Sequence, residues 1–172
     1  MRVVLAVAGI SMLLHPAFAQ QSLDTQTVVV GPWTIATTYK ADKFENCTMA
    51  RTTTGFGIAF VRNPDGLLLA VDSAKWKLER GKAYSIKLSA GPQTVDAKAL
   101  AESKSVTIAL ADRSFNERLR SANTLEVRGE GATLRLPLDG SAAGLERLDQ
   151  CFDKNSKESP EVNPFVTPGR KP

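Results

Sequence analysis

Apolar and polar residues alternate along most of this chain, which is the period of β-strands that bury one face. In residues 28–39 the alternate positions are bulky or β-branched: Trp33, Ile35, Thr37 and Tyr39. Further short stretches of this kind cover residues 47–53, 56–61, 67–71, 76–79, 83–88, 95–99, 105–111, 125–127 and 134–138. We expect about eight or nine of these stretches to be strands, with residues 95–99 at an edge of the sheet.

Turn-forming sequences separate several of these stretches. Asn63-Pro64-Asp65-Gly66 predicts a hairpin between the strands on either side of it, because proline presets φ and glycine accepts a positive φ. Arg80-Gly81-Lys82 predicts a second hairpin between the stretches that flank it. Gly129-Glu130-Gly131 predicts a third, in which the outward-facing Glu126, Arg128 and Arg135 can pair across the strands.

The period changes to that of a helix at residues 114–122. Ser114 and Glu117 fit a capping box, in which each side chain bonds a free backbone N–H of the first turn. Phe115 precedes Leu119 by one helical turn, so the two side chains share a face. A short helix is therefore predicted here.

A second, C-terminal helix is predicted for residues 141–152, with an apolar stripe formed by Leu145, Leu148 and Phe152. Together the elements predict one mainly β domain over residues 20–152. We expect a single-domain β-sandwich or a partly open barrel with two short helices.

The two ends of the chain are expected to lie outside this domain. Residues 1–19 have the features of a secretory signal: Arg2, an apolar run over residues 3–14, and Ala17-Phe18-Ala19 as a cleavage pattern. That run is shorter than the roughly 20 residues of a membrane-spanning helix. We therefore expect a periplasmic or secreted protein without a transmembrane segment. Residues 153–172, which are polar and contain several prolines, are expected to be a disordered tail.

Loss of the leader would also remove the only histidine, His15. Serine and cysteine triads, common zinc sites and a base that titrates near neutral pH all depend on imidazole. The mature chain would keep 21 basic against 18 acidic side chains after Arg2 is lost, an excess too small and scattered to indicate nucleic-acid binding. We expect neither a cofactor nor a metal.

Two cysteines, Cys47 and Cys151, remain after the leader. An even number of cysteines in an oxidising compartment favours a disulfide bond. The bond would close a loop of roughly 100 residues, and the chain-entropy model assigns such a loop about 4 to 5 kcal/mol. Two free thiols, or pairing with another chain, are the alternatives.

A cluster of basic residues surrounds one tryptophan in the second predicted hairpin. The cluster consists of Lys75, Trp76, Lys77, Arg80 and Lys82. It is either a solvated turn whose charges discourage aggregation, or a contact surface for a protein or an acidic envelope component, with the tryptophan as anchor.

Paired carboxylates could act as an acid and a base without histidine, as in glycoside hydrolases. The candidates fall at turns or strand ends, where aspartate usually has a capping role: Asp65, Asp72, Asp96, Asp112 and Asp139. A small hydrolase that uses such a pair is one alternative function. An inhibitor or modulator of an envelope hydrolase, with the basic hairpin as its contact, is another.

Two segments resemble the invasion-associated locus B family of exported bacterial proteins. Gly31-Pro32-Trp33-Thr34-Ile35 followed by Cys47-Thr48-Met49-Ala50-Arg51 is similar to the Gly-x-Trp strand and Cys-x-Met segment of that family. Residues 124–127 and 134–145 are similar to its closing strand, glycine and small-residue helix. The family usually has a cysteine just after the tryptophan strand, where this chain has Ala36 and Thr37. The resemblance implies an exported, mainly β, non-enzymatic domain, which in some relatives is linked to host-cell interaction. The first hypothesis for this chain is therefore a domain that binds or scaffolds a partner without catalysis.

Overall fold

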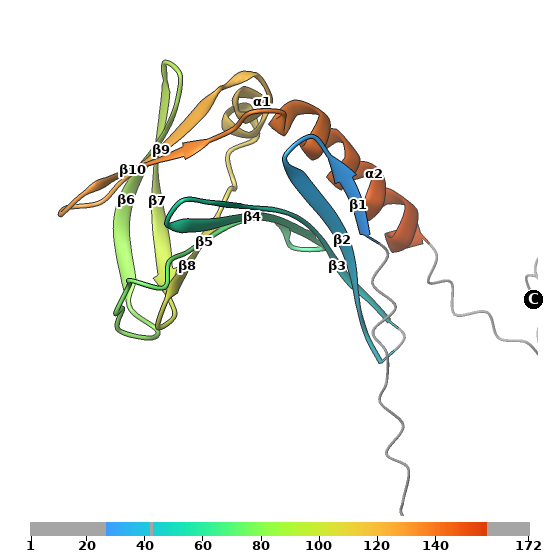
Figure 1. Cartoon of the computed structure of the whole chain (residues 1–172), viewed down its shortest axis with the longest axis horizontal. Helices are drawn as coiled ribbons and strands as arrows, with labels where there is room; N and C mark the ends of the chain where they lie inside the picture. Colours follow the sequence, from blue (N-terminus) through green and yellow to red (C-terminus); the bar gives the residue numbers. More distant parts are fainter. Residues whose placement is uncertain (1–26, 42, 158–172) are drawn as a thin grey trace, which may run out of the picture.

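A computed structural model describes residues 27–41 and 43–157, and within them ten antiparallel strands form one continuous sheet (Figure 1). Across the sheet the strands follow the order β1-β2-β3-β4-β5-β8-β7-β6-β9-β10. Their bounds are Thr27–Val30 for β1, Trp33–Lys40 for β2, Lys43–Thr53 for β3, Phe56–Asn63 for β4, Gly66–Asp72 for β5, Ala83–Ala90 for β6, Gln93–Ala101 for β7, Ser105–Ala109 for β8, Thr124–Arg128 for β9 and Thr133–Pro137 for β10. The sheet is not closed, because β1 and β10 are its two edges.

The helices are α1 (Arg113–Ser121) and the C-terminal α2 (Ser141–Lys157). Figure 1 shows the sheet curving from β2 and β3, beside α2, through β4 and β5 to β6 and β7 on the other side. A salt bridge between Arg120 and Asp149 joins the two helices. The predicted class, a mainly β chain with two helices, is therefore confirmed. The predicted leader lies outside the described residues.

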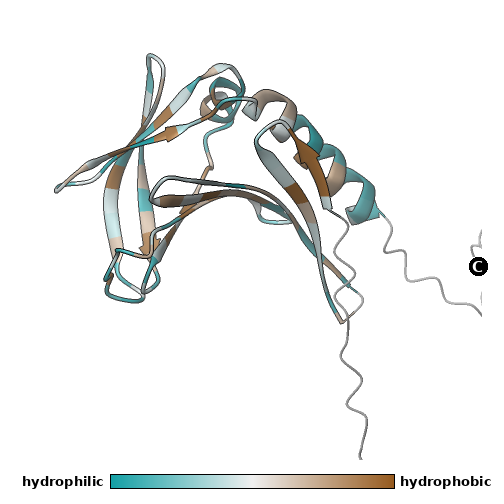
Figure 2. Cartoon of the chain, in the orientation of Figure 1, coloured by the Kyte–Doolittle hydropathy of each residue, from teal (hydrophilic) through white to brown (hydrophobic). Residues whose placement is uncertain are grey.

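The core occupies the inner face of the curved sheet, and the alternating residues that point inward are buried on nearly every strand. Each helix adds a pair of large buried apolar side chains, Phe115 and Leu119 from α1 and Leu145 and Leu148 from α2. Figure 2 shows hydrophobic bands along the strands and a hydrophilic C-terminal end of α2. None of the helices in the described part of the chain is both long and apolar enough to cross a membrane.

Trp33 of β2 lies in the part of the core that α2 covers. It is fully buried, and its indole N–H donates a hydrogen bond of 2.8 Å to the backbone oxygen of Asp139. The guanidinium of Arg51 lies 5.2 Å from the centre of its ring. A Cβ at Gly144 would lie 2.6 Å from the Met49 sulfur, so the absence of a side chain at this position lets α2 approach β3 closely.

The predicted disulfide is present: Cys47 of β3 bonds to Cys151 of α2, with the Cα atoms 6.2 Å apart. Thr37 lies beside the bond, with its hydroxyl oxygen 3.4 Å from the Cys151 sulfur. The bond therefore holds the C-terminal helix against β3, the third strand from the β1 edge of the sheet.

The first predicted hairpin is confirmed, and it joins β4 and β5. The Asn63 side-chain oxygen accepts hydrogen bonds of 3.0 Å from the backbone N–H groups of Asp65 and Gly66. The third predicted hairpin joins β9 and β10, and Arg135 forms the predicted ion pair with Glu126 at 3.0 Å.

The predicted strand over residues 76–79 is wrong. These residues form no strand, because both sides of β6 already pair, one with β7 and the other with β9. The segment instead bonds to the β7–β8 connection, with the Leu78 N–H donating to Ser103 O at 3.0 Å. Residues 95–99 are likewise not an edge strand, because β7 lies between β6 and β8.

The helix ends also differ from the prediction. Asp112, and not Ser114, caps α1 by accepting a hydrogen bond from the Phe115 N–H at 2.8 Å. Helix α2 continues to Lys157, so the first residues of the predicted tail, 153–157, are helical. The rest of that tail lies outside the described residues.

The cap makes stability depend on pH in a direction that can be tested. The hydrogen bond from Phe115 N–H, together with the one from the Ser114 hydroxyl, lowers the pKa of Asp112 below its ordinary value. Because the folded pKa is lower than the unfolded one, this stabilisation is complete above about pH 4 and is lost as the pH falls through the folded pKa.

We expect Asp112→Ala to lower the melting temperature by a few degrees at pH 7 and by less at pH 2.5. Asp112→Asn, whose amide oxygen still caps the helix but carries no charge, should lose less than alanine at pH 7, and its difference from the wild type should shrink or reverse at pH 2.5. Differential scanning calorimetry at the two pH values measures this. An equal loss for alanine at both values would contradict the assigned role of the carboxylate.

Candidate binding pocket

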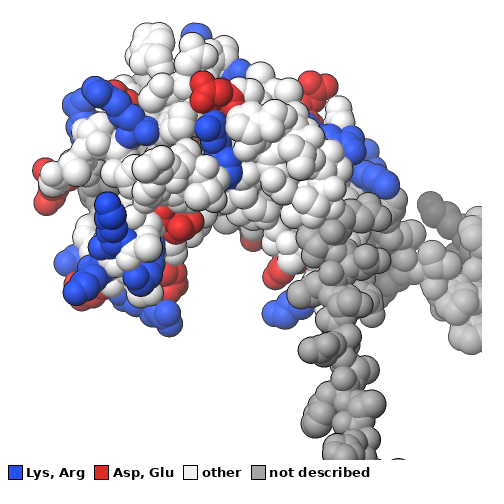
Figure 3. All heavy atoms as spheres, viewed as in Figure 1, with Lys and Arg blue, Asp and Glu red and all other residues white. Residues whose placement is uncertain are grey.

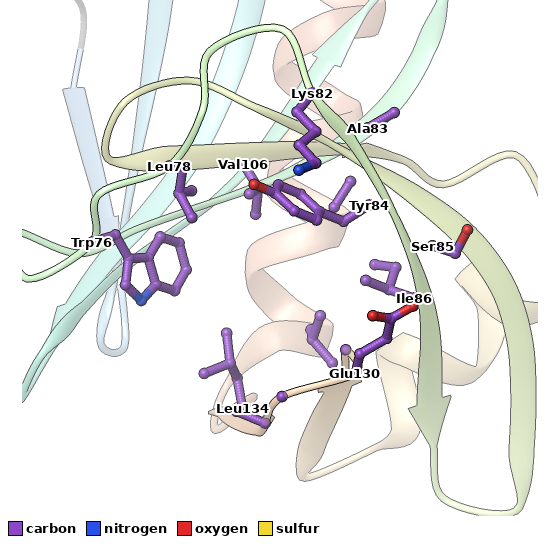
Figure 4. Close-up of a pocket in the computed structure, with 15 residues that line it drawn as sticks. Trp76, Leu78, Lys82, Ala83, Tyr84, Ser85, Ile86, Val106, Glu130 and Leu134 are labelled. Atoms are coloured by element: carbon purple, nitrogen blue, oxygen red, sulfur yellow. The ribbon is translucent and has the colours of Figure 1, made fainter.

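The open end of the curved sheet contains a pocket of about 620 Å³ (Figure 4). Its lining comes from segments that are far apart in the chain: the loop of residues 73–82, strands β6, β7, β8, β9 and β10, and the β9–β10 turn. The larger apolar side chains that line it are Trp76, Leu78, Tyr84, Ile86, Val127 and Leu134. Figure 4 shows Trp76 and Leu134 on one side of this space, with Tyr84 facing it from β6. The volume lies within the usual range for small-molecule sites, about 300 to 1,000 Å³.

The pocket is open because small residues occupy its rim. Its floor belongs to the core, since Ile86, Val127 and Ala99 are at most 8% exposed. The β9–β10 turn contributes Gly129 and Gly131 to the lining, and neither has a side chain that could cover this floor.

Backbone hydrogen bonds hold the loop of residues 73–82, which we call the 73–82 loop, in place at the rim. Ser73 N–H donates to Lys104 O at 3.0 Å, and Gly81 N–H donates to Ala101 O at 2.8 Å. The Trp76 ring also packs against the Phe56 ring, with 6.2 Å between their centres. The sequence therefore places a half-buried tryptophan in a wall that is anchored at both ends.

Polar groups of the lining lie at the rim. Lys82 Nζ is 3.2 Å from the Glu79 carboxylate and 5.6 Å from the centre of the Tyr84 ring. The hydrogen bond to Glu79 raises the pKa of Lys82 above its ordinary value, so the ammonium is charged at neutral pH. On the opposite rim, the exposed Glu130 has no ion pair with any of the described residues.

Of the five predicted contact residues, two line the pocket and three do not. Trp76 and Lys82 line the pocket. Arg80 pairs with Glu102 at 2.9 Å, whereas Lys75 and Lys77 are exposed and have no ion pair within the described part of the chain.

The sequence pattern placed the other lining residues in strands but did not indicate that they line a pocket. Tyr84, Ile86, Val127 and Leu134 fit inward-facing positions of an ordinary core. Alternation along a strand does not tell whether an inward position meets a packed neighbour or a cavity. The one sequence feature that could have indicated a cavity is the pair of glycines in the β9–β10 turn, which have no side chains to fill it.

The candidate carboxylates do not converge. Asp96 pairs with Lys87 at 2.7 Å, Asp139 with Arg51 at 3.3 Å, and Asp112 caps α1. Asp65 and Asp72 lie at opposite ends of the β4–β5 hairpin. Within the described residues there is no group of three or more acidic, histidine or cysteine side chains that could hold a metal ion.

Charge is distributed unevenly over the outer face of the sheet. Two rows of cross-strand neighbours that start at β1 contain no charged side chain: Val29, Thr34, Ala50, Ala59, Ala70, Thr107, Leu100 and Ala83 in one, and Thr27, Ala36, Thr48, Val61, Leu68 and Ala109 in the other. Figure 3 shows basic side chains, with some acidic ones, gathered at the end that carries the 73–82 loop. On the face shown there, basic side chains are therefore concentrated beside the pocket.

Comparison with protein-family models, curated proteins and solved structures found no match to this chain.

Proposed function

We propose that this chain is an exported binding domain without catalytic activity, and that the pocket at the open end of the sheet is its ligand site. The observation that carries the proposal is an apolar pocket whose floor is the core itself and whose polar groups lie at the rim. Such a pocket is the usual form of a small-molecule site.

The disulfide supports the exported part of the proposal, because bonds of this kind persist in oxidising compartments. The leader-like residues 1–19 and the resemblance to the invasion-associated locus B family agree with it. The proposed location is the periplasm or the medium.

Binding accounts for the pocket better than acid–base chemistry does. A hydrolytic site needs an acid and a base that face the same reacting atom. The lining contains a single carboxylate, that of Glu130, so it has no pair of carboxylates that could act as acid and base.

A second candidate function is the modulation of an envelope hydrolase through the 73–82 loop. The exposed and unpaired Lys75 and Lys77 favour contact with an acidic protein surface. This function ranks second because the loop is bonded to the β7–β8 connection and does not stand away from the sheet.

A photo-cross-linker placed in the pocket tests the proposal. We expect Tyr84→p-benzoylphenylalanine, in the full chain expressed in the cells that produce it, to form an adduct with a molecule of defined mass on irradiation. Thr48→p-benzoylphenylalanine, on the charge-poor outer face, should form none. Mass spectrometry of the purified protein identifies the adduct. Equal labelling at both positions, or none at either, would refute a ligand site in this pocket.

A further inference from the structure

We propose that the ligand of this pocket is an amphiphile with an aliphatic chain and an anionic head, either a carboxylate or a phosphate. This inference rests on the proposed function, since it names the class of molecule that the same pocket takes. The chain would lie against the floor formed by β6 and β9, and the head would lie at the rim beside Lys82.

The interior of the pocket favours hydrocarbon over a peptide or a heteroaromatic ring. The polar side chains of the lining, Lys82, Tyr84, Ser85 and Glu130, are partly or fully exposed. The buried floor residues Ile86, Ala99 and Val127 have no side-chain donor or acceptor. A peptide or a heterocycle that lies against this floor would bury N–H and C=O groups without side-chain partners, and this costs free energy. An aliphatic chain has no such groups.

The charge at one rim favours an anionic head. The 73–82 loop contains four basic residues and one acidic residue. Lys82 is the one whose side chain lines the pocket, and Lys75 and Lys77 are exposed without ion pairs among the described residues. Figure 4 shows the Lys82 ammonium turned toward the Tyr84 ring at this rim.

The pair between Lys82 and Glu79 does not prevent Lys82 from binding a ligand. Both side chains are more than half exposed, at 52% and 74%. Exposed pairs of this kind are weak, so an incoming carboxylate or phosphate can take the place of Glu79. Glu130 on the opposite rim would repel the anion from that side, and this places the head next to the loop.

The two tryptophans of the chain give a direct test. Trp33 is fully buried beneath α2, whereas Trp76 lines the pocket. Bromine quenches indole fluorescence at contact, so a dibrominated C18 fatty acid should quench Trp76 and leave Trp33 emitting. We expect Trp76→Phe to lose most of the quenching while calorimetry still detects binding.

Chain length and head group are tested by calorimetry below the concentration at which each amphiphile forms micelles. Each added CH₂ should lower Kd about three- to fourfold until the pocket is filled. Dodecanoate and dodecyl phosphate should bind at least tenfold more tightly than dodecyltrimethylammonium at low salt. At 0.5 M salt this difference in Kd should be smaller, because salt screens the charge of the head group. Comparison of the two anions tells whether a carboxylate or a phosphate is preferred.

Variants separate head recognition from chain binding. Lys82→Met should weaken dodecanoate about five- to tenfold and leave dodecanol unchanged, because the ammonium is lost and the aliphatic stem is kept. Lys43→Met, an exposed lysine at the start of β3, should change neither. Ala132→Trp, which adds a bulky side chain at the exposed rim, should weaken both ligands.

The outcomes distinguish this inference from the proposed function. If a Tyr84 adduct forms with a peptide, a protein or a sugar, and no alkyl ligand quenches Trp76, the lipid-like ligand is refuted and the binding site stands. If the cationic amphiphile binds as tightly as the anionic ones, the anionic head is refuted. If neither adduct nor quenching is seen, both proposals fail.

Discussion

Replacing Cys47 and Cys151 together by alanine is expected to lower the free energy of unfolding by about 2 to 5 kcal/mol. The bond joins residues 104 positions apart, so it restricts the unfolded chain strongly. Cys47 is also fully buried, and its truncation leaves a small void beside the contact between α2 and β3. A typical domain has about 5 to 15 kcal/mol of stability in total, so this loss is a large fraction.

Urea unfolding of the oxidised wild type, the reduced wild type and the double alanine variant measures this effect. Reductant should destabilise the wild type and leave the double variant unchanged. Thiol titration of the denatured, unreduced wild type should find no free thiol. Two titratable thiols, or a loss below about 1 kcal/mol, would contradict the stabilising role of the bond.

Trp33→Ala is expected to cost about 3 to 5 kcal/mol, the usual range for truncation of a buried tryptophan. Its side chain is fully buried and lies between α2 and the sheet, so the void would form where the helix meets the sheet. The variant also leaves the Asp139 carbonyl oxygen without its 2.8 Å donor, and Arg51 without the ring over which it lies.

Equilibrium urea unfolding of Trp33→Ala, Trp33→Phe and Trp76→Ala tests this assignment. Phenylalanine should recover part of the loss, because it restores apolar volume but not the hydrogen bond. Trp76→Ala is the control, and it should cost clearly less because Trp76 is only half buried at the pocket rim. A cost for Trp76→Ala equal to that for Trp33→Ala would show that the core beneath α2 is not the main support of the fold.

Features that depend on neighbours in the sequence were predictable. The β4–β5 hairpin follows from Asn63 to Gly66, whose turn is closed by the Asn63 side chain. The change of period at residue 114 located α1, and the cysteine count indicated the disulfide. In each case the residues that decide the structure lie within a few positions, or they are the only ones of their kind.

Features that depend on distant partners were not predictable. Residues 76–79 alternate like a strand, yet the edges of β6 are taken by β7 and β9, which come later in the chain. The N-cap was assigned to Ser114 because its spacing to Glu117 fits a capping box, whereas Asp112 is the residue that accepts from Phe115 N–H. The pocket was not predicted because it forms only where the 73–82 loop and the β9–β10 turn meet.

The position of the disulfide also constrains the order of maturation. Synthesis runs from the N-terminus, so Cys47 emerges first and Cys151 follows 104 residues later. The early thiol must therefore stay unpaired while the rest of β3, the seven strands from β4 to β10, α1 and the first part of α2 are made. Any chain that stops before α2 is finished keeps a reactive sulfur, which can be captured by another unfinished copy. Completion of the last helix thus decides whether the bond forms within one molecule or between two.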